Sequence, residues 1–136
     1  MGLSSLDALN VLDSRFGNGA AAVTNAPATY YLALSTTTPD SDGNNLTEPS
    51  GGGYARVAMT NNSTTFDAAQ QDQKWNAIVL TFPTATTDWG LCTHFALYDV
   101  ATGGTPRVWG DLTNAQDIAI GIAPSFPVGA IVITVS

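Results

Sequence analysis

Apolar residues recur at intervals of three and four along the first stretch of the chain, at Leu3, Leu6, Leu9, Leu12 and Phe16. This spacing places them on one face of an α-helix, which Ser4 can begin and Gly17 can end. We therefore expect an N-terminal helix within residues 1–17. Its apolar face must pack either against the rest of the chain or against a neighbouring molecule.

From residue 28 onward, short runs of alternating apolar and polar residues are separated by Gly, Asn and Pro. Such alternation between turn residues is typical of β-strands. The runs lie at 30–35, 54–60, 75–82, 93–99, 105–111, 117–122 and 129–135. Their near-regular spacing favours antiparallel pairing over alternating strands and helices. The predicted fold class is mainly β: an antiparallel β-sandwich or barrel of about seven strands with one N-terminal α-helix.

Between the first two predicted strands lies a long loop, 36–53, which ends in the triplet Gly51, Gly52 and Gly53. A loop of this length in a compact domain is usually functional, mobile or part of an interface. The predicted organisation is a single domain over 1–136. It consists of the helix at 1–17 and a β domain at 28–136 that carries the loop.

Charge is scarce in this chain. Of its 136 residues, 44% are hydrophobic and 11% are charged, and the net charge is −7. A chain of this size can bury one hydrophobic core without disulfide bonds, which its single cysteine cannot form internally. We expect neither a nucleic-acid partner nor a membrane partner, because phosphate groups require clustered Lys and Arg and the chain has only four, far apart.

Groups that catalysis would need are also few. Cys92 and His94 are two residues apart, which on a strand places both side chains on one face. They can be interpreted as a Cys-His nucleophile, but we favour ordinary packing residues. The stretch from Asp40 to Asn44 matches a calcium loop only in part, because Gly43 comes too early, and a turn is the simpler interpretation. We expect no catalytic residue, no metal, no cofactor and no enzymatic activity.

Three aromatic side chains suggest a different function. Trp89, Trp109 and Tyr98 can form a sugar-binding surface, since aromatic faces beside amides bind glycans. The alternative is that tryptophan fills the core of a small β domain, its indole N–H bound to a carbonyl. We expect at least two of the three tryptophans in the whole chain to lie in the core and not on such a surface.

Several strings of the sequence resemble a known family. The most specific are Gly-Gly-Gly-Tyr-Ala-Arg at 51–56, Trp-Gly at 89–90 and His-Phe-Ala-Leu-Tyr-Asp at 94–99. Further similarity covers 31–36, 48–50, 82–86, 102–104, 109–113 and 129–135. Together these segments resemble a family of small tailed-bacteriophage virion proteins. Its members are usually labelled tail fibre or minor tail proteins, and small β proteins of this type also serve as capsid cement or decoration proteins.

The resemblance implies a structural protein of the virion, made in the cytoplasm of the bacterial host. A fibre normally needs a long shaft, whereas this chain has the length of a single globule without repeats. We therefore expect a capsid cement or decoration protein, acting as a homotrimer that binds the phage major capsid protein. The alternative is a short tail-fibre or minor tail protein that binds tail or baseplate proteins and host-surface glycans.

The residues expected at the interaction surfaces combine the apolar helix face, the Gly-rich motif and two tryptophans. They are Leu3, Leu6, Leu9, Leu12, Phe16, Gly51, Gly52, Gly53, Tyr54, Arg56, Trp89 and Trp109.

Overall fold

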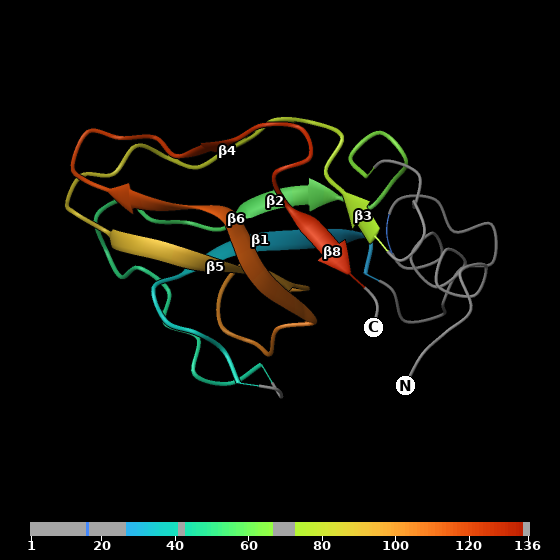
Figure 1. The fold of residues 1–136 in the computed structure, drawn as a ribbon, viewed down its shortest axis with the longest axis horizontal. Helices are drawn as coiled ribbons and strands as arrows, with labels where there is room; N and C mark the ends of the chain where they lie inside the picture. The colour runs from blue at the N-terminus through green and yellow to red at the C-terminus, as the bar shows by residue number, and fades with distance from the viewer. Residues whose placement is uncertain (1–15, 17–26, 41–42, 67–72, 135–136) are drawn as a thin grey trace.

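The computed structural model describes residues 16, 27–40, 43–66 and 73–134. The described residues form eight strands (Figure 1). They are β1 (Thr29–Ser35), β2 (Val57–Thr60), β3 (Gln73–Trp75), β4 (Leu80–Thr81), β5 (Gly90–Tyr98), β6 (Val108–Ile118), β7 (Ser125–Phe126) and β8 (Val132–Thr134).

The largest element is a four-stranded sheet in the order β2-β1-β5-β6, with every pair antiparallel. At its centre β1 pairs with β5, with Leu32 opposite Leu97 and Leu34 opposite Phe95. These four side chains point to the same face because directly opposed residues of an antiparallel pair share a side of the sheet. Alternation along β1 thus gives the sheet one strongly apolar face.

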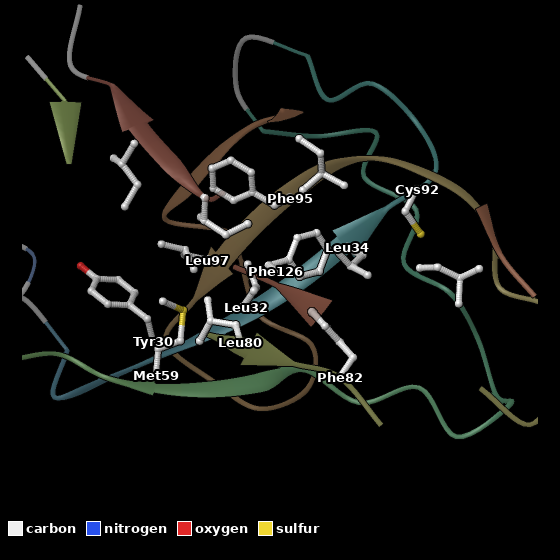
Figure 2. Packing of buried hydrophobic residues seen from close by; sticks show 14 of the residues in the cluster. Tyr30, Leu32, Leu34, Met59, Leu80, Phe82, Cys92, Phe95, Leu97 and Phe126 are labelled. Carbon is white, nitrogen blue, oxygen red and sulfur yellow. The ribbon is translucent and has the colours of Figure 1, made fainter. Parts of the chain in front are cut away.

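Two separate ribbons, β3-β8 and β4-β7, each contain two antiparallel strands. Their apolar side chains join those of the large sheet in one continuous core (Figure 2). The ribbons contribute Leu80, Phe126 and Ile133, and the sheet contributes Leu32, Leu97 and other buried residues. The core therefore lies between one complete sheet and two short ribbons.

The opposite face of the large sheet has a smaller cluster. Ala33, Ala96 and Tyr98 are buried there, and Leu46 of the long loop packs against them together with Trp109. The loop 36–53 thus covers part of the sheet face that lies away from the main core.

The predicted fold class, a β-sandwich or barrel of about seven strands with an N-terminal helix, is wrong. The sheet does not close, since β2 and β6 are its two edges, and the described residues contain no helix. The helix expected at 1–17 lies outside the described residues except for Phe16, which sits in a bend.

Most of the expected strands have different limits in the structure, and two of the differences have a physical reason. The run 75–82 is divided into β3 and β4 by Asn76, whose side-chain amide binds the carbonyl oxygens of Ile78 and Pro127 and the N–H of Ile131. The backbone of Asn76 also bonds to Ile131 and Gly129, so backbone and side chain together hold this residue to the segment 127–131 where β3 ends. Conversely, 105–111 and part of 117–122 are joined in one long strand, β6, whose register against β5 shifts between Cys92 and His94.

Candidate functional site

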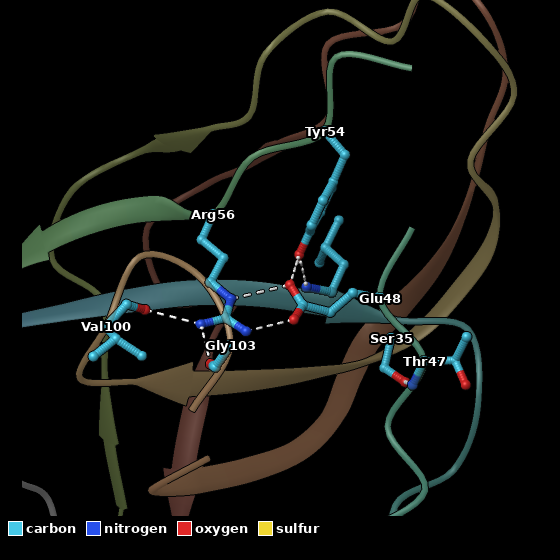
Figure 3. A network of polar contacts seen from close by, with 8 residues as sticks. Ser35, Thr47, Glu48, Tyr54, Arg56, Val100 and Gly103 are labelled. Atoms are coloured by element: carbon cyan, nitrogen blue, oxygen red, sulfur yellow. Dashed lines mark hydrogen bonds and ion pairs between the residues drawn. The ribbon is translucent and has the colours of Figure 1, made fainter. Parts of the chain in front are cut away.

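The Gly-rich loop is anchored by an ion pair between two of its flanking residues (Figure 3). Arg56 donates from Nη2 to Oε1 of Glu48 over 2.6 Å and from Nε to Oε2 over 3.1 Å. The hydroxyl of Tyr54 donates to the same Oε2 over 2.7 Å. Glu48 lies three positions before the glycines and Arg56 three positions after them, so the pair closes the Gly-rich segment at its base.

Arg56 also reaches a second turn of the chain. Its Nη1 donates to the carbonyl oxygens of Val100 and Gly103, each over 2.9 Å, and its guanidinium lies 3.5 Å from the centre of the Tyr98 ring. The Arg56 side chain is only 4% exposed. A planar group with five donors is suited to joining a carboxylate, two carbonyls and an aromatic face at once.

Tyr54 completes the arrangement on the side of the sheet. Pairing between β1 and β2 ends at Leu32, and beyond it the N–H of Leu34 donates to the Tyr54 hydroxyl over 3.1 Å. Burial, reinforced by the hydrogen bond to Glu48, raises the pKa of Tyr54 well above its ordinary value. The phenol therefore stays protonated and acts as a link between the sheet and the ion pair.

The ion pair stabilises its own charged state. Burial alone lowers the pKa of Arg56, but the hydrogen bond and the negative charge of Glu48 outweigh it and raise the pKa above its ordinary value. We call the group of Glu48, Tyr54 and Arg56 the loop clamp. Most of its polar atoms are used within the protein, which makes it a structural element more than a centre for chemistry.

The glycines are required by close contacts. Gly51, Gly52 and Gly53 all have positive φ, a region that residues with a Cβ rarely occupy. A Cβ on Gly52 would lie 2.1 Å from Oγ1 of Thr87. The Gly52 carbonyl accepts hydrogen bonds from Nε1 of Trp89 over 2.9 Å and from the N–H of Thr86 over 2.8 Å. The Gly-rich motif therefore fixes the loop against the segment 86–89.

A hollow of about 420 Å³ lies beside the loop clamp. It is lined in part by Tyr31, Ser50, Thr102 and all three members of the clamp. The charged groups of this wall already bind each other, and Pro49, Ala55 and Ala101 add apolar surface, so the hollow offers a partner few free polar groups.

The two tryptophans that we assigned to an interaction surface lie apart. Trp89 is 6% exposed and belongs to the main core, where its indole N–H is bound. Trp109 is half-buried on the other sheet face, against Gly43, where a Cβ would come within 2.6 Å of its ring. With Tyr98 buried under Arg56, these rings do not form a common platform for a sugar.

Phe16 packs onto the sheet of its own chain. Its ring stacks on Tyr30 with 4.9 Å between centroids and meets Phe66 edge-on at 5.4 Å. The other apolar residues of the predicted helix face, Leu3, Leu6, Leu9 and Leu12, lie outside the described residues. Of the expected interaction residues that the structure describes, the Gly-rich motif, Tyr54, Arg56 and Trp89 lie together, whereas Phe16 and Trp109 lie elsewhere.

Cys92 and His94 do not form a pair, contrary to the shared face that their spacing suggested. The register shift between them directs Cys92 into the main core, whereas Nε2 of His94 lies 2.8 Å from Oδ1 of Asp111. Burial raises the pKa of the Cys92 thiol to about 11, which suppresses its nucleophilic thiolate form. Asp40 uses its carboxylate to bind the N–H of Asn44, as expected for a turn.

Glu48 is the clamp residue absent from the interaction residues that we expected from the sequence. The available signal was the pair of opposite charges on either side of the glycines: Glu48 lies eight positions before Arg56, which is the one cation between Arg15 and Lys74. In a chain with so few cations, an acid and a base that flank the same loop indicate an ion pair.

Comparison with known proteins gives one family. The family model described as "Podophage GP4 fiber I protein gp80" matches residues 2–134. No curated protein matches the chain. In the part of the chain that the structure describes, no helix has the length and apolar character needed to cross a bilayer.

Proposed function

We propose that this protein is a subunit of a short tail fibre, because the chain belongs to the podophage GP4 fiber I protein gp80 family. Membership of this family makes it a structural component of a bacteriophage virion. The observation that carries the finer assignment is the description of the family, a fiber protein, whose model matches residues 2–134.

The described structure supports a role in assembly. The charged and polar groups of the most specific motif are used to hold one loop. An uncharged surface of hydroxyls and amides is covered by a neighbouring subunit at lower cost than a charged one. We propose that the protein works without catalysis and without a cofactor.

The family description favours the fibre over the capsid cement protein that we first expected. The length of the chain argued against a fibre on the assumption that each subunit must provide its own shaft. A short fibre built from several small globules removes that assumption. We propose a homotrimer bound to tail or baseplate proteins, because closed symmetric assemblies are usual for such subunits, with neither nucleic acid nor membrane as a partner.

Antibody labelling of intact particles in the electron microscope tests the location. We expect label at the tail, with an antibody against the major capsid protein as the control for the shell. Label distributed over the shell would contradict the fibre assignment.

A further inference from the structure

The turn that follows β6 is apolar and open to solvent. Residues 119–123, Ala-Ile-Gly-Ile-Ala, are all exposed, with Ile120 65% and Ile122 43% exposed. In the sequence, the alternation of Ile118, Ile120 and Ile122 predicts a buried strand. However, β6 ends at Ile118, and only that isoleucine enters the core. A run of exposed apolar residues is unfavourable in water unless a partner covers it.

Hydrogen bonds hold this isoleucine turn (residues 119–123) in one conformation. The N–H of Ile122 donates to the carbonyl of Ala119 over 3.2 Å, and the N–H of Ile120 donates to the carboxylate of Asp88 over 2.8 Å. Ala85 binds the turn twice, through its N–H to Ile122 and through its carbonyl to Gly121, each over 2.8 Å. A side chain presented by a pre-ordered turn loses little conformational entropy on binding.

The isoleucine turn occupies one end of the molecule. In Figure 1 the chain leaves the arrowhead of β6 at the left edge of the view, whereas β8 ends and β1 begins towards the right. The isoleucine turn therefore lies at the end opposite to strands β3 and β8.

The charges around the isoleucine turn indicate the kind of partner. Exposed Asp88 binds the turn itself, and exposed Asp117 lies opposite Leu91 at the end of β6. A second copy of the chain is poorly suited to meet these acids. The described cations are used elsewhere: Arg56 pairs with Glu48, Arg107 pairs with Asp99, and Lys74 is buried.

We infer that the isoleucine turn anchors this protein to a different virion protein, by inserting Ile120 and Ile122 into an apolar pocket bordered by Lys or Arg. The virion origin of the partner rests on the proposed function, whereas the pocket chemistry follows from the exposed isoleucines and their acidic border. Apolar anchors surrounded by complementary charge are the common form of interface hot spots.

Complementation of a phage that lacks the gene tests this inference. The double variant Ile120→Ser, Ile122→Ser is compared with Val79→Ser, which changes an aliphatic side chain that is 58% exposed elsewhere on the surface. We expect both purified variants to match the unchanged protein in melting temperature and sedimentation. The number of copies per particle should be at least about tenfold lower for the double variant than for the unchanged protein. It should be unchanged for Val79→Ser and several-fold lower for Asp117→Lys.

Normal incorporation of the double variant, or an equal loss for Val79→Ser, would overturn the inference and leave the fibre assignment intact. It would also be overturned if the unchanged protein self-associated and the double variant did not, because the occupant would then be a second copy. Absence of the unchanged chain from particles would contradict the fibre assignment and, with it, a virion partner.

Discussion

At the scale of single residues, Arg56 is the side chain on which the loop 36–53 depends most. It connects Glu48 before the glycines to the carbonyls of Val100 and Gly103 across the sheet. We predict that Arg56→Met lowers the free energy of unfolding by about 3 kcal/mol, because it leaves a partly buried carboxylate and two carbonyls without their donor. Urea unfolding followed by tryptophan fluorescence measures this loss.

Arg107→Met provides the matched control for that variant. Arg107 pairs with Asp99 over 3.0 Å, but each side chain is 34% exposed. Water screens such a pair, so the expected loss is below about 1 kcal/mol. Equal losses for the two variants would show that Arg56 has no special structural role.

The buried thiol of Cys92 gives a prediction that depends on pH. Its pKa is raised by burial from an ordinary value of 9.0 to about 11 in the folded protein. Between these two values the unfolded chain loses the thiol proton first, so this group's contribution to stability is complete below pH 9 and falls as the pH approaches 11.

At pH 8 we therefore expect iodoacetamide to modify Cys92 at least about a hundredfold more slowly in the folded protein than in urea, because the thiolate is rarer and covered. Mass spectrometry of the alkylated protein over time measures both rates. Similar rates in the two states would show that the thiol is accessible and ionised, and would reopen a chemical role for it.

At the scale of elements, the Gly-rich loop depends on backbone conformation as well as on the clamp. We predict that Gly52→Ala lowers the free energy of unfolding by about 2–4 kcal/mol, because it adds a clash with Thr87 to an unfavourable positive φ. Gly51→Ala shares the positive φ but meets open space, so its loss should be about 1 kcal/mol. Thermal unfolding of both variants compares them, and an equal effect would contradict the close packing at Gly52.

The strands also show which parts of the fold the sequence pattern could predict. Alternation located β1 and most of β5, because the alternate residues Leu32, Leu34, Phe95 and Leu97 all face the main core. It failed at Asn76, where side-chain hydrogen bonds to Ile78 and Pro127 accompany the end of β3, and where β6 extended through polar residues with a shifted register. Such features depend on contacts between residues far apart in the chain, and no local pattern encodes them.

The candidate site was predictable to a similar degree. The glycines, Tyr54, Arg56 and Trp89 were found from an unusual string and from rare residue types, and the structure brings them together. Their roles were not predictable, since Gly52 meets Trp89 across 37 positions of sequence. The isoleucine turn was mistaken for a strand because alternation does not reveal whether anything covers a side chain.

At the scale of the whole molecule, the scarcity of charge is the property that unites the account. With 11% charged residues and a net charge of −7, the chain keeps its described cations in internal pairs or buried positions and exposes acids and uncharged groups. This distribution disfavours phosphate-bearing partners and favours protein neighbours that bury hydroxyls, amides and isolated apolar anchors.

The most direct test of the account is the number of copies of this chain in a purified particle. Quantitative mass spectrometry, with the major capsid protein as the internal standard, measures it. A tail-fibre subunit should be present in a small number of copies, far below that of the capsid protein. Hundreds of copies in fixed ratio to the capsid protein would contradict the fibre assignment.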